Sequence, residues 1–325
     1  MKAIVYHNYG SPEVLKCEEI EKPAVGDHEV LIKVRAASVN PLDWRLMRGK
    51  PVFVRLMIGG LRKPKLTRPG VDVAGQVEAV GRSVTQFKPG DEVFGGCRGA
   101  FAEYACAIED RLALKPANLS FEDAAAVPVA AISALQGLRD KGRIQRGQKV
   151  LVDGASGGVG TFAVQIAKSF GAEVTAVCST RNVDSARSIG ADHVIDYTRE
   201  DFTQSGQRYD LILAANAYHS IFHYRRALSQ DGIYVMAGGG GVQILQAMLL
   251  GPLLSLMGSR KMRFFMANIN KEDLVLLKDF LEAGEIVPVI DRRYPLSDVA
   301  EALRYLEEGH AQGKVVITVE HRNDT

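Results

Sequence analysis

The sequence has few cysteines, and the four that it contains show no paired spacing. It therefore lacks the closely spaced pairs that build a disulfide framework in secreted domains. We expect unlinked thiols in Cys17, Cys97, Cys106 and Cys178 and a reducing, cytoplasmic location. A disulfide between Cys97 and Cys106 is the alternative.

A strong charge of either sign is also missing, because 40 Lys and Arg against 38 Asp and Glu leave a net charge of +2. This balance gives no support for a nucleic-acid partner. No uninterrupted apolar run reaches the roughly 18 residues that a membrane-spanning helix needs. The opening MKAIVY predicts a short strand rather than a signal peptide. With 46% hydrophobic and 24% charged residues, the 325-residue chain is typical of a globular protein of about two domains.

The first 120 residues predict mostly β structure. Residues 30–36, 73–80 and 92–95 follow the β-branched, turn-bounded pattern of short strands. The turns between them are dense in glycine and proline. We expect a small twisted barrel or sandwich.

After Pro128 the pattern changes to alternating strands and helices. Strands are expected over residues 149–152, 173–178, 193–197, 209–215 and 232–237. Such alternation predicts an α/β domain with a doubly wound parallel sheet. Amphipathic stretches at 272–283 and 296–308 precede a final strand at 314–319, which we expect to return to the first domain. The expected domains are residues 1–122, an inserted nucleotide-binding domain at 123–262, and a returning segment at 263–325.

A glycine-rich turn, DGASGGVG, joins the strand at 149–152 to a helix at 159–170. Gly154, Gly157 and Gly160 lie three residues apart, and the helix carries apolar residues at three- and four-residue steps. Glycines in this context let backbone N–H groups approach a pyrophosphate at the positive end of the helix. We therefore expect a dinucleotide site, with phosphate contacts from Ser156, Gly157, Gly158 and Val159. The alternative is a glycine-rich connection without a ligand.

The end of the next strand indicates which dinucleotide binds. An acid there would hold a ribose 2′-hydroxyl, but no acid occurs before Asp184. Ser179, Thr180 and Arg181 instead suit a 2′-phosphate, with each charge-assisted hydrogen bond contributing roughly 1.5–3 kcal/mol. We expect NADPH rather than NADH. An ordinary polar loop is the alternative, because Ser and Thr also cap helices.

Several stretches together resemble the medium-chain dehydrogenase/reductase superfamily, and within it the zinc-independent quinone oxidoreductases, the zeta-crystallin-like group. They span nearly the whole chain in the family's order: ASVNPLDW, PGVDVAGQVEAVG, FKPGDEVFG, AAAVPVAAISALQGL, GASGGVG, GADHVIDY and GKVVI. The resemblance implies a Rossmann domain inserted in a GroES-like β-barrel catalytic domain, and assembly as a homodimer.

The same resemblance shows where a catalytic zinc would be held in the zinc-dependent relatives. Matched motif to motif, the ligand positions are occupied here by Asn40, Val71 and Val129. Valine cannot ligate a metal, and the four-cysteine lobe of those relatives is missing. His219 and His223 have a spacing that ligands can have, but no third ligand is evident, and the polar side of an exposed helix explains them. We expect no metal.

Without zinc, the feasible chemistry is hydride delivery from NADPH to a small electron-poor acceptor, a quinone or an α,β-unsaturated ketone or aldehyde. Negative charge then develops on the acceptor oxygen and needs hydrogen-bond donors. The resemblance makes Asn40 and Asp43 of the NPLD segment the candidate catalytic residues, with Asn40 as the donor. The same residues also form a helix start, with Asn40 at the N-cap and Asp43 in the first turn. Both roles are compatible.

The resemblance implies further cofactor contacts. Tyr197 matches a tyrosine used near the adenosine phosphate; a core aromatic at a strand end is the alternative. The backbone at Gly238 and Gly239 is expected to run past the nicotinamide. Phe264 and Phe265 are expected in a similar place, and Lys314 is expected to reach a phosphate. A solvated strand lysine explains Lys314 equally well.

Two segments are apolar and free of acids: residues 45–68, which also carry eight basic residues, and residues 242–263, which Gly251-Pro252 interrupts. We interpret them as flexible covers over an apolar pocket or as a subunit contact. The sharper hypothesis is weak peripheral contact with an anionic membrane.

The leading functional hypothesis is thus an NADPH-dependent, zinc-free quinone or enone oxidoreductase. A simple carbonyl reductase of the alcohol dehydrogenase type would require a polarising acid that the sequence does not supply. A low-turnover NADPH-binding sensor or interaction protein is the hypothesis from another class.

Overall fold

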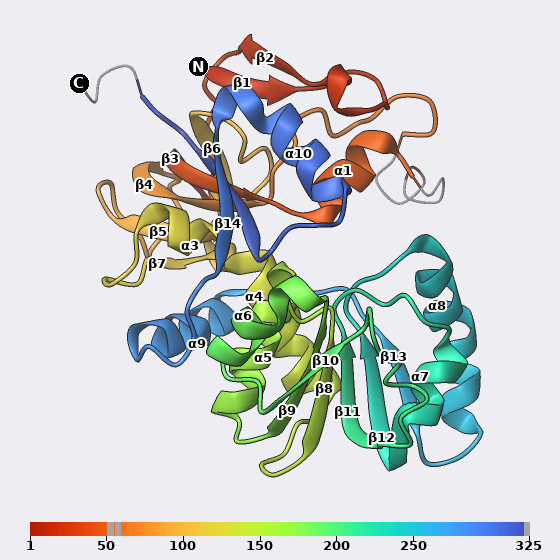
Figure 1. Cartoon of the computed structure of the whole chain (residues 1–325). Helices are drawn as coiled ribbons and strands as arrows, with labels where there is room; N and C mark the ends of the chain where they lie inside the picture. Colours follow the sequence, from red (N-terminus) through yellow and green to blue (C-terminus); the bar gives the residue numbers. More distant parts are fainter. Residues whose placement is uncertain (51–54, 56–59, 322–325) are drawn as a thin grey trace. The chain divides into compact units, whose positions relative to one another are not determined.

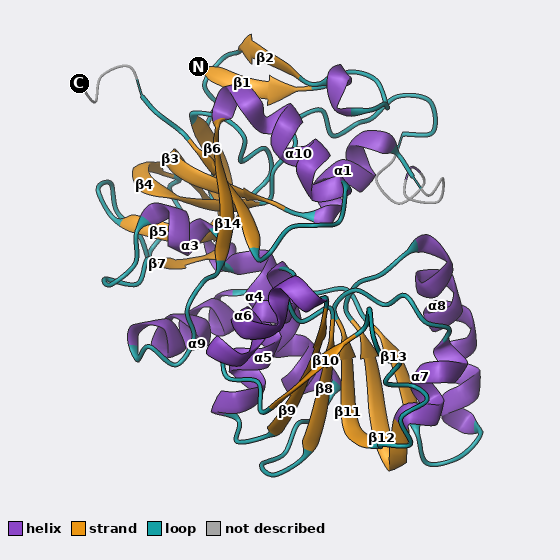
Figure 2. Ribbon diagram, viewed as in Figure 1, coloured by secondary structure: helices purple, strands orange, loops and turns teal. Residues whose placement is uncertain are grey.

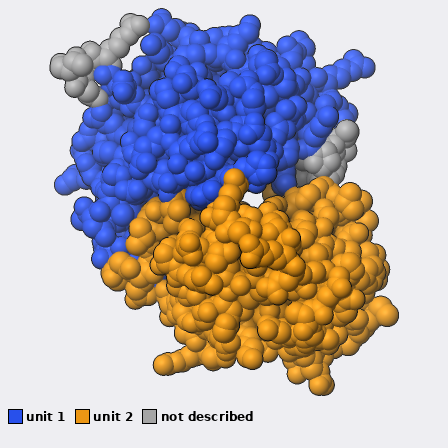
Figure 3. All heavy atoms as spheres, viewed as in Figure 1, with its two compact units in different colours: residues 1–129, 269–282, 290–325 blue, residues 130–268, 283–289 orange. Residues whose placement is uncertain are grey.

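A computed structural model describes residues 1–50, 55 and 60–321. The chain forms two compact units, drawn in two colours in Figure 3. Unit 1 contains residues 1–129, 269–282 and 290–325, and unit 2 contains residues 130–268 and 283–289. Unit 2 is therefore an insertion in unit 1, as the sequence predicts. Among the described residues, no helix is long and apolar enough to cross a membrane.

The two main boundaries fall after residues 129 and 268 rather than after 122 and 262. Helix α3 (Phe121–Ala125) packs on strands β3 and β4 of unit 1, which keeps residues 123–129 in that unit. Strand β13 (Lys261–Phe264) completes the sheet of unit 2 and was not predicted. Residues 283–289 return to unit 2, where the Gln165 amide accepts the N–H of Val287 at 2.8 Å and donates to its carbonyl at 3.0 Å.

Unit 2 is built on a six-stranded, fully parallel sheet in the order β10-β9-β8-β11-β12-β13 (Figure 1). Its central strands are continuous apolar runs because both faces are covered by helices. The first five strands agree with those predicted: β8 (Lys149–Asp153), β9 (Glu173–Cys178), β10 (His193–Asp196), β11 (Tyr209–Ala214) and β12 (Leu228–Met236). Their carboxyl ends meet at one edge of the sheet, where ligands bind in doubly wound folds.

The helical elements of unit 2 follow its strands or open the unit (Figure 2). They are α4 (Pro128–Gln136), which starts at the boundary, η3 (Gly137–Lys141), α5 (Gly158–Ser169), η4 (Thr180–Asn182), α6 (Val183–Ser188), α7 (Ile221–Ala227) and α8 (Gly241–Leu256). The expectation that Gly251-Pro252 interrupts the apolar segment is wrong, because α8 continues through both residues. A Cβ atom at Gly251 would lie 3.1 Å from the Met262 carbonyl oxygen, so glycine lets α8 pack closely on β13.

The described residues of unit 1 form a seven-stranded sheet and a separate hairpin-like pair, β1 (Lys2–Val5) with β2 (Lys16–Glu19). The sheet runs β14-β15-β3-β4-β5-β7, and β6 also pairs with β3. Its strands are β3 (Glu29–Val39), β4 (Asp72–Val80), β5 (Glu92–Gly96), β6 (Tyr104–Ile108), β7 (Leu112–Leu114), β14 (Ile290–Pro295) and β15 (Lys314–Thr318). Strand β15 pairs antiparallel with β3, so the end of the chain does return to the first domain.

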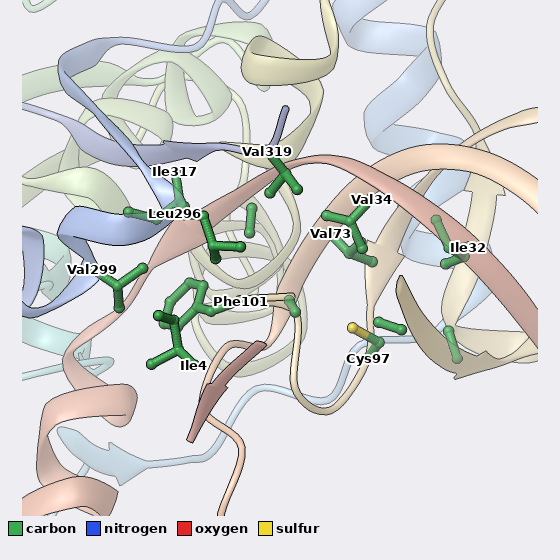
Figure 4. Close-up of a cluster of buried hydrophobic side chains, with 14 of the residues drawn as sticks. Ile4, Ile32, Val34, Val73, Cys97, Phe101, Leu296, Val299, Ile317 and Val319 are labelled. Atoms are coloured by element: carbon green, nitrogen blue, oxygen red, sulfur yellow. The ribbon is translucent and has the colours of Figure 1, made fainter. Parts of the chain in front are cut away.

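The core of unit 1 joins residues from both ends of the chain. Figure 4 shows Ile4 and Phe101 beside Leu296, Val299 and Ile317. The helical elements around this core are η1 (Pro12–Val14), α1 (Pro41–Arg48), η2 (Glu109–Arg111), α3, α9 (Lys271–Glu282), η5 (Leu296–Asp298) and α10 (Val299–Glu307). The pairing of β15 with β3 brings the first residue of β15 to the end of β3, where α1 begins.

Candidate functional site

Of the three spaced glycines in the turn between β8 and α5, only one leaves room for a ligand. Gly154 has a φ of +79°, and a Cβ atom there would lie 2.8 Å from the Cβ of Asn216. A Cβ atom at Gly160 would overlap the carbonyl oxygen of Gly154. At Gly157 a Cβ atom would make only an ordinary 3.6 Å contact with that oxygen. Gly154 and Gly160 are therefore needed by the fold, whereas Gly157 leaves the approach to the backbone open.

The N-terminus of α5 adds the electrostatic part of an anion site. The first N–H groups of a helix have no acceptor within it, and the helix dipole makes this end positive. No acid occupies the first turn of α5. Ser156, Gly157, Gly158 and Val159 are all partly exposed. This turn therefore fits a pyrophosphate.

The residues after β9 carry the side chains that are expected to discriminate between NADPH and NADH. Thr180 and Arg181 are exposed and Ser179 is half-buried. The Thr180 hydroxyl donates to Asp196 at 2.5 Å, and Arg199 lies 3.4 Å from the same carboxylate. Hydrogen bonds, the one from Thr180 foremost, lower the pKa of Asp196. Sequence reasoning missed this acid because it belongs to the neighbouring strand β10 rather than to β9.

An exposed pair of tyrosines lies at the same edge. The rings of Tyr197, after β10, and Tyr218, after β11, have centroids 5.9 Å apart. Tyr197 is 51% exposed, so the alternative of a core aromatic is wrong. Tyr218 was not predicted, and no motif in the sequence marks it. Because β9 and β8 lie between β10 and β11, the pair reaches over the carboxyl ends of the two strands that carry the phosphate-site residues.

Gly238 and Gly239 follow β12 and pack against the segment after β11. A Cβ atom at Gly238 would overlap the Ala215 carbonyl oxygen, and Gly239 has a φ of +153°. Phe264 ends β13 and is half-buried, but Phe265 is buried in unit 2. The burial of Phe265 leaves Phe264 as the member of that pair with an accessible ring.

In unit 1, Asn40 and Asp43 lie where predicted, at the start of α1. The Asp43 carboxylate accepts the backbone N–H of Asn40 at 2.8 Å and that of Gly70 at 3.1 Å. Burial, together with the charge of Asp72, raises the pKa of Asp43 to about 7, against the effect of these two hydrogen bonds. Asp43 therefore holds the helix start in place.

Asp72 and Lys314 complete a buried polar cluster around Asn40. The Asp72 carboxylate accepts from the Asn40 amide at 2.9 Å and from the Ser38 hydroxyl at 2.6 Å. The Lys314 ammonium group donates to Asn40 Oδ1 at 2.8 Å and lies 3.3 Å from Asp72. Lys314 is 3% exposed, so the alternative of a solvated lysine is wrong. Asp72 was not predicted as a site residue, and a phosphate contact was one of two expectations for Lys314, whose ammonium group bonds within unit 1.

The positions of the zinc ligands in the zinc-dependent relatives do not provide a metal site. Val71 and Val129 offer no ligating side chain, and the Val129 N–H donates to Asp72 at 2.9 Å. Within residues 1–50, 55 and 60–321, no group of three or more His, Cys, Asp or Glu side chains is arranged to hold a metal ion. His219 precedes α7 and packs against Phe202, so only His223 lies on the exposed helix as expected.

The two acid-free segments differ in what the structure describes. Val52, Phe53, Val54, Leu56, Met57 and Ile58 of segment 45–68 lie outside the described residues. Segment 242–263 forms most of α8 and β13. All four cysteines are free, so the alternative of a disulfide between Cys97 and Cys106 is wrong.

Two family models match the chain. The alcohol dehydrogenase GroES-like domain matches residues 26–117, and a family described as zinc-binding dehydrogenase matches residues 189–317. The donor set described above does not fit the zinc that the second description implies, and we derive no chemistry through a metal.

The chain is also similar along nearly its whole length to other known proteins. It is 39% identical to the 2-methylene-furan-3-one reductase of Solanum lycopersicum, over 98% of this chain and 79% of that protein. It is 36% identical to the chloroplastic NADPH-dependent alkenal/one oxidoreductase of Arabidopsis thaliana, with the same coverage. The solved structure of a quinone oxidoreductase from Coxiella burnetii is 30% identical and has a TM-score of 0.87, covering 98% of this chain and 99% of that one.

Proposed function

Because the chain belongs to the zinc-independent quinone oxidoreductase group of the medium-chain dehydrogenase/reductase superfamily, we propose that it is an NADPH-dependent oxidoreductase of quinones or α,β-unsaturated carbonyl compounds. The observation that carries this proposal is the glycine turn, in which Gly157 is open to a ligand at the positive end of α5. When bound, NADPH supplies the hydride. The names of two relatives, an alkenal/one oxidoreductase and a quinone oxidoreductase, support the acceptor class.

The residues of unit 2 bind and orient the cofactor. The N–H groups of residues 156–159 hold the pyrophosphate. Ser179 and Arg181 hold the 2′-phosphate, while Thr180 stays bound to Asp196, whose charge Arg199 offsets. Tyr197 and Tyr218 flank the adenosine, because their rings are exposed beside the phosphate-site strands. Gly238, Gly239 and Phe264 remain proposed contacts near the nicotinamide.

In unit 1 the Asn40 amide is the proposed donor to the acceptor oxygen. One amide hydrogen is directed to Asp72 at 2.9 Å, whereas the contact to the Ser38 carbonyl is 3.4 Å long and therefore weak. The weakly bonded N–H is the one that a stronger acceptor, an oxygen gaining negative charge, would recruit. Asp43 acts on Asn40 by fixing its backbone N–H, so we propose a positioning role for Asp43.

We propose a homodimer on the evidence of one apolar face. Large apolar side chains of α8 are exposed along one stripe of the helix: Val242, Leu245, Met248, Leu249, Leu253 and Leu256. The stripe adjoins a hollow of about 580 Å³ that Met248, Phe264 and Arg263 help to line. Strand β13, at the end of the sheet, leaves one edge open to pairing. A second copy of the chain would cover both features at once.

The mass of the protein in solution tests the homodimer. The wild type should have twice the chain mass, and Leu249→Lys with Leu253→Lys should convert it to a monomer. A wild type that is monomeric but sediments with anionic vesicles would favour the membrane contact instead.

For the location, we propose the cytoplasm, whose reducing conditions keep the four thiols free. Cell fractionation tests this location.

The function is tested with purified protein in the presence of a chelator. NADPH and NADH oxidation are compared with an ortho-quinone, a para-quinone, an enone, an enal and a saturated aldehyde. We expect NADPH-selective turnover with quinones or with the unsaturated carbonyls. Turnover of the saturated aldehyde alone would indicate a simple carbonyl reductase, and tight NADPH binding without any turnover would indicate a sensor.

A further inference from the structure

A buried carboxyl group lies directly beneath the glycine turn. Asp153 is the last residue of β8 and immediately precedes Gly154, and its side chain is 1% exposed. Its Oδ2 atom accepts a hydrogen bond from the Tyr224 hydroxyl on α7 at 2.5 Å. Among the described residues it forms no ion pair. Asp153 belongs to none of the predicted site residues and has no part in the proposed hydride transfer.

Asp153 and Tyr224 together hold the segment after β11 against the glycine turn. The Asp153 carbonyl oxygen accepts the N–H groups of Ala215 and Asn216 at 2.9 and 3.3 Å. The Tyr224 hydroxyl accepts a hydrogen bond from the N–H of Tyr218 at 3.2 Å and donates one to the Asp153 carboxyl group. Asp153 and Tyr224 thus connect the glycine turn with the backbone that carries the exposed Tyr218 ring.

The surroundings of this carboxyl group favour its neutral form. Burial raises the pKa of Asp153 to about 7, although the hydrogen bonds from Tyr224 and from the N–H of Gly154 act in the opposite direction. The phenols around it, Tyr224, Tyr234 and Tyr218, also have raised pKa values and stay neutral. On the adjoining segments, His219 lies 3.5 Å from Asp201, and burial lowers the pKa of His219.

We propose that Asp153 and Tyr224 are positioning residues for the cofactor, and that NADPH binding raises the fraction of Asp153 that is protonated. This rests on the cofactor site of the proposed function and not on the identity of the acceptor. A pyrophosphate held by the turn places negative charge beside an uncompensated buried carboxylate, and like charges favour protonation. The neutral carboxyl group still accepts from Tyr224, so the segment stays in place.

The consequence is an affinity for NADPH that falls as the pH rises through neutrality. Below pH ~6 Asp153 is already protonated and costs the complex nothing. At pH ~8 most of the free protein must first take up a proton, which weakens binding about tenfold. Asp153→Asn, a neutral isostere, should bind as the wild type does at the lower pH and about tenfold more tightly at the higher pH.

Calorimetric titration of the full chain with NADPH tests the proposal. At neutral pH, buffers of different ionisation enthalpy report the number of protons taken up. Wild type should take up more protons than Asp153→Asn, and the exposed-acid control Asp231→Asn should match the wild type. The NADPH phosphate and His219 also titrate, but they remain in the variant, so the difference isolates Asp153.

A tyrosine pair separates positioning from packing. Tyr224→Phe should weaken NADPH binding several-fold, because the Tyr218 N–H loses its acceptor and segment 215–218 loosens. Tyr234→Phe removes a hydroxyl from the ring stacked 4.6 Å away and should bind normally. Equal proton uptake in wild type and Asp153→Asn would overturn the proposal.

If Asp153→Asn does not fold, Asp153→Ser takes its place in the same comparison, and equal proton uptake in wild type and Asp153→Ser would overturn the proposal. A wild type that turns over substrate without the proton difference contradicts this inference only. A wild type that does not bind NADPH contradicts the proposed function and this inference together.

Discussion

The ammonium nitrogen of Lys314 lies 2.8 Å from the Oδ1 atom of Asn40, across 274 residues of sequence. The contact exists because β15 pairs with β3, which ends one residue before Asn40. An amide whose oxygen accepts from an ammonium group must turn its NH2 group the other way, here toward Asp72. Lys314 therefore fixes the orientation of the proposed donor.

Replacing Lys314 by methionine should lower turnover and stability while leaving NADPH affinity unchanged. Removing one partner of a buried ion pair typically costs about 3–5 kcal/mol, because Asp72 keeps an uncompensated charge. Thermal unfolding, NADPH titration and kcat measure the three effects, with the exposed Lys88→Met as control. An equal loss of NADPH affinity would support the phosphate contact expected from the sequence.

Alanine substitutions at two of the spaced glycines should have different effects on stability and on NADPH binding. Gly160→Ala forces a Cβ atom onto the Gly154 carbonyl oxygen and should lower the thermal midpoint. Gly157→Ala meets no close contact and should leave the midpoint unchanged, yet weaken NADPH binding because the methyl group occupies the ligand's approach. Gly241→Ala, where nothing lies within 4 Å, is the control. Normal NADPH binding by Gly157→Ala would argue against a pyrophosphate site at the glycine turn.

Arg181→Ala should change the choice of dinucleotide. Losing one charge-assisted hydrogen bond to the 2′-phosphate costs roughly 1.5–3 kcal/mol, or about ten- to a hundredfold in affinity for NADPH. NADH lacks this phosphate, so its affinity should not change. Fluorescence titration with both dinucleotides measures the ratio, and Arg187→Ala on α6 is the matched control. An equal loss of affinity for NADH would show that Arg181 does not contact the 2′-phosphate.

Stability should decline as the pH rises from about 6 to about 8. Burial raises the pKa of Asp43 and of Asp153 to about 7, one in each unit. Each group binds its proton more tightly in the folded state than in the unfolded chain. Its contribution is present below the unfolded pKa and is lost as the pH rises through 7, by up to ~1.4 kcal/mol per pH unit.

Thermal midpoints across this range check the pH dependence. The double variant Asp43→Asn, Asp153→Asn should flatten it, and Asp231→Asn should not. The lowered pKa values of Asp192 and Asp196 affect stability only at more acidic pH. A wild-type midpoint that rises over the range would contradict the assignment.

The sequence was sufficient for features that depend on local pattern. The strand, glycine turn and helix around Gly157 follow from periodicity and glycine spacing, and the start of α1 follows from the capping pattern at Asn40. The insertion of one domain in another followed from the final strand and from the resemblance. These signals are local, or repeat a known order of motifs.

Features that depend on pairing between distant segments could not be predicted. The burial of Lys314 requires the register of β15 on β3, and the contact of Asp196 with Thr180 requires β10 beside β9. Likewise, nothing in the sequence shows that Tyr224 reaches Asp153 across the sheet face. Helix α8 was missed because a Gly-Pro pair normally interrupts a helix, whereas here packing on β13 maintains it.

An isotopic label on NADPH shows where the transferred hydride goes. The protein is incubated, with a chelator present, with an α,β-unsaturated ketone and NADPH that carries deuterium at the transferable position of the nicotinamide ring. Mass spectrometry and NMR then locate the label. We expect deuterium on the β-carbon of the saturated ketone and an α-proton from solvent. Deuterium on the carbonyl carbon, or a product without label, would contradict it.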